Sequence, residues 1–286
     1  MRLEAVRRLR NEHKLLRLCR VLRVNRSTYY KHFREVESAR IIENQKLRRL
    51  ILDIYIKSKK RFGAEKIRQR LGREYGVKIS LGRVYRLKNS IGLPAMVTVK
   101  PKYKAPKKDE AKTYENKLNG QFNPDKPNAV WVSDITYQKT RAGWCYVCVI
   151  IDLYARKVVS WRAGRRAVSA LTAETLAAAM RARNYPGGVI FHSDRGVQYT
   201  SEEFRRAADR FNVVQSFSAK AKPCDNAVAE SFFKFLKLEE LNRKIFADLN
   251  DLSAALSAYL FWYNRNRPHS ANNGLSPLEK EVLFIS

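Results

Sequence analysis

The order of apolar patterns after Ala129 constrains the fold of this chain more than any other feature. Three runs rich in β-branched and aromatic residues come first, and only short turns separate them. Helical and strand patterns then alternate. In chain order we expect strands at 129–139, 143–154 and 157–165, a helix at 169–183, a strand at 188–194, a helix at 201–212, a strand at 213–218, and helices at 226–241 and 248–269. This order predicts an α/β domain at 129–286, built on a mixed five-stranded sheet.

The first 38 residues have a helical pattern instead. Apolar residues recur at helical spacing between 15 and 22, and residues 25–27 break the pattern. A second short helix follows, with Ser27 as its expected N-cap, and it carries Tyr29 and Lys31. Two short helices joined by a turn are the layout of a helix-turn-helix unit. We therefore predict an N-terminal DNA-binding unit at 1–38, although any small helical hairpin shares this pattern.

A second helical region is expected at 39–99. A long helix at about 39–59 precedes a helical pair at 63–76 and 80–93, and Ser80 is suited to cap the last helix. Three basic side chains lie on that last helix: Arg83, Arg86 and Lys88. The pattern favours a second helix-turn-helix unit in which these three residues contact DNA. The alternative is that they are ordinary solvent-exposed charges on the protein surface. Residues 100–128 are rich in Lys, Pro and Asn without an apolar period, and we expect a basic linker there.

The charge of the chain points to a polyanionic partner. The sequence has 57 Lys and Arg residues against 27 Asp and Glu, a net charge of +30, and 35 of the basic residues precede Ala129. Neutralisation of phosphates dominates the non-specific affinity of proteins for nucleic acid, so double-stranded DNA is the expected partner. A membrane is disfavoured because the sequence has no run of about 18 apolar residues. The N-terminus also lacks the apolar core of a signal peptide.

Cys145 and Cys148 resemble one half of a zinc or redox motif. They lie in an expected strand, however, where residues three apart point to opposite faces of the sheet. No second Cys or His pair has zinc-site spacing. We therefore expect both cysteines in the core, in a protein of a reducing compartment, which indicates the cytosol.

Three acidic residues are candidates for catalysis. Asp134 lies inside the first apolar strand, where a carboxylate is unfavourable without a compensating partner. Asp194 ends the fourth strand, and Glu230 lies one turn into a helix that otherwise supplies apolar residues to the core. Carboxylates held close together repel one another unless a cation lies between them. Mg²⁺, with Mn²⁺ as a substitute, suits oxygen ligands beside a phosphate substrate.

The spacing of these acids resembles that of a known family. Thirty-five residues separate Asp194 from Glu230, and Lys237 follows Glu230 by two helical turns. This arrangement, with the words WVSDITY, FHSDRGVQYTS, PCDNAVAESFFKFLK and FWYNRNRPHSANNGLSPLE, resembles the retroviral-integrase-like core of DDE-type insertion-sequence transposases. The segments KRFGAEKIRQRL and RVYRLKNSIGL resemble the helix-turn-helix that precedes this core in the orfB-type transposases of the third insertion-sequence family. The resemblance implies a ribonuclease-H-like fold.

The resemblance also implies roles. Asp134, Asp194 and Glu230 would bind Mg²⁺ and catalyse DNA cleavage and strand transfer at insertion-sequence ends, and Lys237 would contact the DNA. The family implies at least a dimer on DNA and fusion by frameshift to an orfA partner. The chain shows no heptad run of zipper length. Two alternatives stay open: a non-enzymatic sequence-specific DNA-binding regulator, and a nuclease of the same fold that does not join strands.

Several residues near the three acids are further candidates. Gln198, Tyr199, Asn226 and Lys234 are candidates for DNA contact, and Asn226 or Asp225 is expected to cap the Glu230 helix. For Asp152 a turn role is favoured over a metal ligand, and His192 either contacts DNA, tunes the site or is satisfied by the backbone. We expect Trp131, Trp144 and Trp161 in the core. The basic end of the last long helix, with Arg265 and Arg267, is expected to touch DNA.

Overall fold

The computed structural model describes residues 1–33, 38–94, 115–218 and 226–285 of the 286-residue chain. The chain divides into two compact units, Met1–Met96 and Val97–Ser286. The first half of the expected linker, 100–114, lies outside the described residues. Within the described ranges, no helix is long and apolar enough to cross a membrane.

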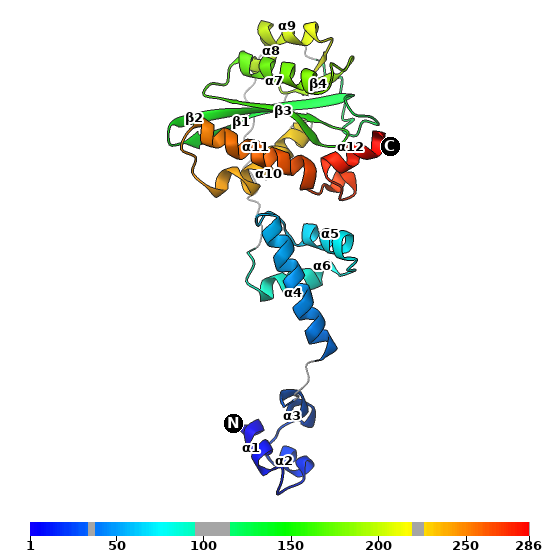
Figure 1. The fold of residues 1–286 in the computed structure, drawn as a ribbon, viewed down its shortest axis with the longest axis vertical. Coiled ribbons are helices and arrows are strands. Elements are labelled where there is room, and N and C mark those ends of the chain that lie inside the picture. The colour runs from blue at the N-terminus through cyan, green and yellow to red at the C-terminus, as the bar shows by residue number, and fades with distance from the viewer. Residues whose placement is uncertain (34–37, 95–114, 219–225, 286) are drawn as a thin grey trace. The chain divides into compact units, whose positions relative to one another are not determined.

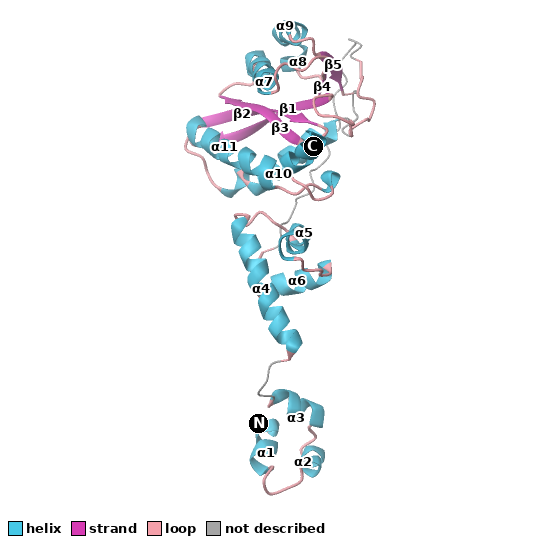
Figure 2. Cartoon of the chain, turned by 45° about the vertical axis from the view of Figure 1, so that its right-hand side comes forward, coloured by secondary structure: helices cyan, strands magenta, loops and turns pink. Residues whose placement is uncertain are grey.

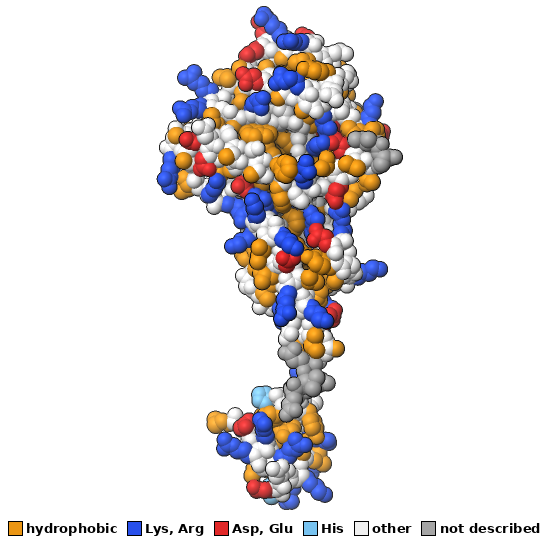
Figure 3. All heavy atoms as spheres, in the orientation of Figure 1, with side chains coloured by type: hydrophobic (Ala, Val, Ile, Leu, Met, Phe, Trp, Pro, Cys, Tyr) orange, Lys and Arg blue, Asp and Glu red, His pale blue; other side chains and the backbone are white. Residues whose placement is uncertain are grey.

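The first unit is helical, as the sequence predicts. Its helices are α1 (Arg2–Leu9), α2 (Leu15–Val21), α3 (Arg26–His32), α4 (Ala39–Lys57), α5 (Ala64–Tyr75) and α6 (Leu81–Ser90). A small core of Val6, Leu18, Cys19 and Tyr29 joins α1, α2 and α3. The helix α1 was not expected from the sequence, and it contributes Val6, which has no exposed surface. On the face drawn in Figure 3, Lys and Arg side chains recur over this unit and over the second one.

Two helix starts in this unit were predicted, and one prediction was wrong. Ser80 caps α6 as expected, because its hydroxyl accepts a hydrogen bond of 3.3 Å from the backbone N–H of Arg83. The cap of α3 is Asn25, whose side chain accepts a bond of 2.9 Å from the backbone N–H of Ser27. Ser27 instead donates its hydroxyl to Asn25. The helix begins at Arg26, so Ser27 is already inside its first turn and cannot be the N-cap. Asn25, just before the helix, accepts the otherwise unpaired N–H of that turn.

The second unit is built on the predicted five-stranded sheet. Its strands are β1 (Val130–Thr140), β2 (Gly143–Asp152), β3 (Lys157–Gly164), β4 (Ile190–Ser193) and β5 (Val214–Phe217). They lie in the order β3-β2-β1-β4-β5, with β1–β2 and β2–β3 antiparallel and β1–β4 and β4–β5 parallel. The helices are α7 (Ser169–Ala182), α8 (Val197–Thr200), α9 (Glu202–Arg210), α10 (Ala227–Glu239), α11 (Leu249–Asn266) and α12 (Pro277–Ile285), with 3-10 turns η2 (Leu241–Arg243) and η3 (Ser270–Asn272). This is the predicted ribonuclease-H-like fold.

Helices cover both faces of the sheet. Figures 1 and 2 show α7, α8 and α9 on one face and α10, α11 and α12 on the other. Successive residues of a strand point to opposite faces, and β1 shows the consequence: Val130 and Val132 join the core beneath α10 and α11, whereas Trp131 joins the core beneath α7 and α9. The two cysteines of β2 divide in the same way. Cys145 belongs to the first core, while Cys148 lies 3.8 Å from the Tyr199 hydroxyl, so both are core residues as predicted.

The second half of the expected linker is packed rather than free. Leu118 is 2% exposed and belongs to the core beneath α10 and α11. Its backbone N–H donates to the Ser216 hydroxyl at 3.1 Å, and the guanidinium of Arg156 donates to the Phe122 carbonyl and the Asn123 side chain. Residues 116–128 lack an apolar period because they form bends and turns instead of a regular helix or strand. The expectation of a linker through residue 128 was therefore wrong for this part.

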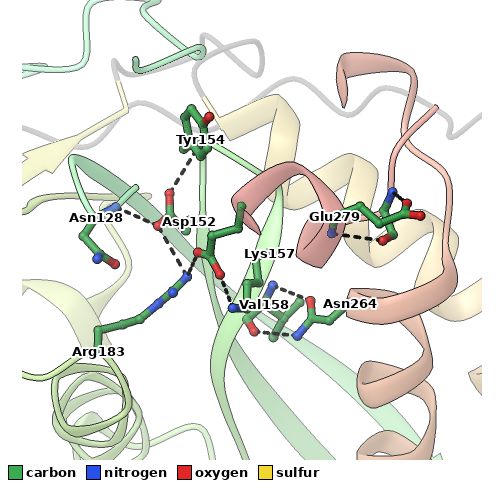
Figure 4. A network of polar contacts seen from close by, with 10 residues as sticks. Asn128, Asp152, Tyr154, Lys157, Val158, Arg183, Asn264 and Glu279 are labelled. Atoms are coloured by element: carbon green, nitrogen blue, oxygen red, sulfur yellow. Dashed lines mark hydrogen bonds and ion pairs between the residues drawn. The ribbon is translucent and has the colours of Figure 1, made fainter. Parts of the chain in front are cut away.

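Helix α12 was not predicted from the sequence, although its first residues carry a helix-start motif. The Ser276 hydroxyl accepts from the backbone N–H of Glu279, and the Glu279 carboxylate accepts from the backbone N–H of Ser276 at 2.7 Å. This reciprocal pair is a capping box, and the word SPLE encodes it. A polar network then fastens α12 to the sheet (Figure 4). In it, Glu281 pairs with Lys157 and with Arg183, whose guanidinium also lies 3.6 Å from Asp152.

Candidate active site

The topology brings Asp134 and Asp194 to the same edge of the sheet. The parallel pair β1–β4 has Val132 opposite His192, so Asp134 and Asp194 each lie two residues further along their strands. Asp194 directly follows the last residue of β4, at the carboxyl edge where mixed sheets place their ligands, and it is exposed. Asp134 lies beside it in the middle of β1, which continues to Thr140. This neighbourhood is the one that a ribonuclease-H-like sheet implies, since its first and fourth strands are neighbours.

Glu230 reaches the site from α10. The buried residues of this helix are Ala229, Phe232, Phe233, Leu236 and Glu239, and the first four belong to the core beneath the sheet. Glu230 falls in the first turn and is exposed. Packing of the apolar stripe thus fixes the rotation of α10, and Glu230 takes its place on the side that the core does not use.

The pKa of Asp134 responds to both other acids. Burial first, and then the negative charges of Asp194 and Glu230, together raise this pKa from an ordinary value of 3.8 to about 7. A hydrogen bond of 2.7 Å from the backbone N–H of Ile135 opposes this rise, as does the positive charge of Lys237. The fold thus disfavours the ionised form of Asp134, which lies near two more acids. A bound cation would offset the repulsion among these carboxylates, so the arrangement suits a metal site.

Lys237 is the basic group of this site. It lies on α10 two turns after Glu230, and its Nζ is 4.9 Å from the ring centre of Tyr137 on β1. Burial lowers the pKa of Lys237, while the charge of Asp134 acts in the opposite direction. The expectation that Lys237 lies near the reacting DNA stays a prediction, and its position beside Asp134 is compatible with it.

Backbone hydrogen bonds orient the two aspartates. Asp134 Oδ1 accepts from the N–H of its neighbour Ile135, and Asp194 Oδ1 accepts from the Gly196 N–H at 3.0 Å. A Cβ at Gly196 would lie 2.9 Å from that same oxygen, so glycine leaves the Asp194 carboxylate room. In the described part of the chain, no group of three acidic, His or Cys side chains is already arranged to hold a metal ion.

Replacement of Asp134 by Asn should stabilise the metal-free protein at pH 8. The pKa of Asp134 is raised by folding, so the ionised carboxylate destabilises the native state above about pH 7. Below about pH 4 the group is neutral in both states, and the variant's advantage should disappear as the pH falls between these values. Thermal melting in EDTA at several pH values measures this. Asp209→Asn, which removes an exposed charge on α9, is the control. Equal melting temperatures of Asp134→Asn and wild type at pH 8 would contradict the prediction.

The DNA candidates differ in exposure. Arg86, Lys31 and Lys234 are exposed, and Gln198 is partly exposed with its side-chain amide donating to the Ala167 carbonyl at 3.0 Å. Arg83 is paired with Glu43 at 2.8 Å and bonded to Asn44, both on α4. Arg83 therefore links two helices, and a DNA contact would compete with these bonds.

Tyr199, Tyr29 and Lys88 are the most deeply buried of the DNA candidates, and for these three the expectation was wrong. Tyr199 is 1% exposed and its hydroxyl bonds to the Ser133 hydroxyl at 2.8 Å. Tyr29 is 2% exposed within the core of α1–α3. Lys88 is 2% exposed and donates to the carbonyls of Leu93 and Pro94. In each case almost no side-chain surface is left for a contact with DNA, because the protein encloses the side chain.

Two flanking residues, Asp152 and His192, are buried. Asp152 accepts from the backbone N–H groups of Asn128 and Tyr154, which confirms the turn role. The ring nitrogens of His192 bond to the hydroxyls of Ser216 and Ser218. Its interpretation as a DNA contact was wrong, because the side chain is enclosed.

Asn226 occupies the N-cap position of α10, but its side chain makes no capping hydrogen bond. It is 7% exposed, and its buried Oδ1 has no hydrogen-bond partner among the described residues. The capping prediction for Asn226 was therefore wrong. The alternative cap, Asp225, lies outside the described residues.

The tryptophan and arginine expectations were partly wrong. Trp131 is fully buried and Trp161 packs against the core, as predicted, whereas Trp144 is 51% exposed. Arg267 is 3% exposed and forms an ion pair of 2.9 Å with Glu239, so it belongs to the interior. Arg265 lies over the ring of Phe261. The sequence analysis missed Glu239, and a buried acid in an apolar helix was the signal that could have found it.

Comparisons with known proteins agree with this arrangement. Residues 124–223 and 212–277 match the family described as "Integrase core domain", and residues 43–102 match the "HTH-like domain". The chain is 34% identical over 275 residues to the transposase InsF of insertion sequence IS3A from Escherichia coli (strain K12), covering 94% of each chain. It is 32% identical over 261 residues to a 31 kDa protein of insertion element IS600 from Shigella sonnei, covering 91% of this chain and 96% of that one.

A solved structure of the HTLV-2 integrase catalytic core domain in complex with magnesium also matches. It is 20% identical, covers 55% of this chain and 98% of that chain, and has a TM-score of 0.42. The assignment does not depend on this loose likeness, since the sequence relatives span nearly the whole length. A helix-turn-helix-like domain followed by an integrase core, with full-length identity above 30% to InsF, identifies the chain as a member of the DDE transposases of the IS3 family.

Proposed function

We propose that this transposase catalyses Mg²⁺-dependent DNA cleavage and strand transfer at the ends of its insertion sequence. The observation that carries the proposal is the placement of Asp134 beside Asp194 on neighbouring parallel strands, with Glu230 near enough to contribute to the raised pKa of Asp134. Three acids from β1, the end of β4 and α10 would hold the metal, with Mn²⁺ as a substitute. Bound divalent ions supply activation of a water or 3′-hydroxyl and stabilisation of the leaving oxygen in an in-line displacement.

The chain's own residues have separate roles in this proposal. Asp134 must be deprotonated to act as a ligand. With a pKa of about 7, part of this group is protonated at neutral pH, and a bound cation would shift it to the anionic form. The backbone N–H of Gly196 and the N–H of Ile135 orient the two aspartates. Lys237 offers a positive charge to a DNA phosphate while it balances Asp134.

The test is a reaction of the full chain with labelled terminal inverted repeats in Mg²⁺ or Mn²⁺. Nicked and joined products support the proposal. Binding without any product indicates the DNA-binding regulator, and nicks without joined strands indicate the simple nuclease. Products that form equally in EDTA would overturn a metal-dependent reaction.

The helix-turn-helix contribution can be tested apart from chemistry. Arg86 is exposed on α6, so Arg86→Ala should weaken binding to the inverted repeat by roughly fivefold or more and reduce the salt slope by about 1. Lys46→Ala removes the same charge from an exposed position of α4 and is the control. Titration of labelled DNA at several salt concentrations gives both quantities. An equal effect of both variants would mean that α6 has no special place on DNA.

We further infer the partners and the compartment. Joining two element ends requires at least a homodimer on DNA. The sequence shows no heptad run of zipper length, so fusion to an orfA product is the expected source of a leucine zipper. The DNA is that of the bacterial nucleoid, in the cytoplasm. Sedimentation of the chain with and without a pair of element ends checks the oligomeric state.

A further inference from the structure

Two large aromatic side chains near the candidate active site face solvent. Tyr137 on β1 is 58% exposed and Trp144 on β2 is 51% exposed. Their rings meet edge to face, with centroids 5.4 Å apart and an interplanar angle of 76°. Burying such side chains in the core would stabilise the fold by a few kcal/mol. The hairpin instead presents both rings together on its surface.

This aromatic pair lies further along the β1–β2 hairpin than Asp134. The strand β4 pairs with β1 only as far as Val132, so both Asp134 and Tyr137 lie where that edge of β1 has no neighbouring strand. Tyr137 follows Asp134 by three residues, which is about 10 Å along a strand, and its side chain leaves the strand on the other face. Lys237, which influences Asp134, also lies over the Tyr137 ring at 4.9 Å. The pair is therefore connected to the site through a shared lysine.

The charge around the pair suits a polyanion. The hairpin sequence from 137 to 146, YQKTRAGWCY, contains Lys139 and Arg141 and no acidic residue. Both basic side chains are exposed. Lys139 pairs directly with Trp144 across the two strands. Aromatic rings between basic side chains are the arrangement that binds unpaired nucleotides, since bases stack on the rings and phosphates meet the cations.

We propose that Tyr137 and Trp144 form a stacking platform for an unpaired base of the DNA strand held at the active site. The proposal rests on the proposed function, because it requires DNA to lie across these acids. A distance of about 10 Å corresponds to about three nucleotides of a stacked strand, so the base lies about three positions from the reacting phosphate. Stacking on an aromatic face is tolerant of sequence, so the platform positions the strand without reading it.

The test uses the full chain in EDTA with an inverted-repeat duplex that ends in a short single-stranded 3′ overhang. 2-Aminopurine replaces each overhang base in turn, and its fluorescence is quenched when it stacks. Wild type should quench one position strongly. Trp144→Ala and Tyr137→Ala should lose that quenching and bind the overhang about 10-fold more weakly, whereas Trp144→Phe and Tyr137→Phe should keep most of both.

Tyr185→Ala is the matched control. Tyr185 is 57% exposed and packs on Phe211, but it precedes β4 and so lies at the sheet edge opposite Asp194. Unchanged quenching in both alanine variants overturns the platform, and so does an equal loss in the phenylalanine variants or in Tyr185→Ala. EDTA separates this result from catalysis: a failure of strand joining in Mg²⁺ by wild type overturns the proposed function, while absent quenching overturns only the platform.

Discussion

Asp194→Asn should abolish strand joining in Mg²⁺ while DNA binding changes less than about twofold. Asp194 is exposed at the end of β4 and contributes no packing, so its substitution leaves the fold intact. Removal of one preorganised group that stabilises charge at a reaction centre typically lowers a rate by about 10²–10³-fold. Loss of a metal ligand should reach at least this range. Products from labelled element ends, quantified against enzyme concentration, measure the effect.

A matched substitution separates catalysis from general loss of charge. Asp209→Asn removes an exposed acid from α9, on the same unit, and should leave joining unchanged. Undiminished joining by Asp194→Asn would remove the proposed mechanism. Loss of DNA binding in the same variant would instead show that Asp194 acts in the complex before chemistry, and this too contradicts the assigned role.

Glu239→Ala should destabilise the catalytic unit by about 3–5 kcal/mol, the typical consequence of leaving one partner of a buried ion pair alone. Arg267 donates through Nε and Nη2 to both carboxylate oxygens of Glu239, at 2.9 and 3.0 Å, and the side chains are 4% and 0% exposed. The Tyr259 hydroxyl donates to the same carboxylate at 2.9 Å. Because these groups join the end of α10 to the end of α11, their loss should loosen the helix that carries Glu230.

Urea unfolding followed by tryptophan fluorescence measures this change. All four tryptophans of the chain lie after residue 129, so the signal reports the catalytic unit alone. Glu202→Ala, which breaks the exposed pair with Arg206, should cost about 0.5 kcal/mol or less. The double variant Glu239→Leu, Arg267→Met should recover much of the stability, since apolar replacement of a buried pair is often neutral. A small effect of Glu239→Ala would contradict a structural role for the pair.

Local patterns were sufficient for the elements and the acids. Runs of β-branched and aromatic residues defined β1 and β2, and the ribonuclease-H-like order of elements placed Asp134 beside Asp194 because the first and fourth strands of that sheet are neighbours. Ser80 was recognisable as a cap because its hydroxyl acts within four residues. Such features depend on neighbours in the chain, so a single sequence carries them.

Burial of individual polar and aromatic side chains was decided only by the tertiary structure. Basic and aromatic residue types are typical of DNA-binding surfaces, yet three of them are buried inside the protein: Lys88, Tyr199 and Arg267. Trp144, expected inside, is exposed because it lies near the tip of the β1–β2 hairpin, outside the part of β2 that pairs with β3. The sequence by itself therefore determined the strand order, the family and the three candidate acids. Which side chains reach solvent follows from how far each strand extends and which helix covers it, and those are properties of the packed molecule.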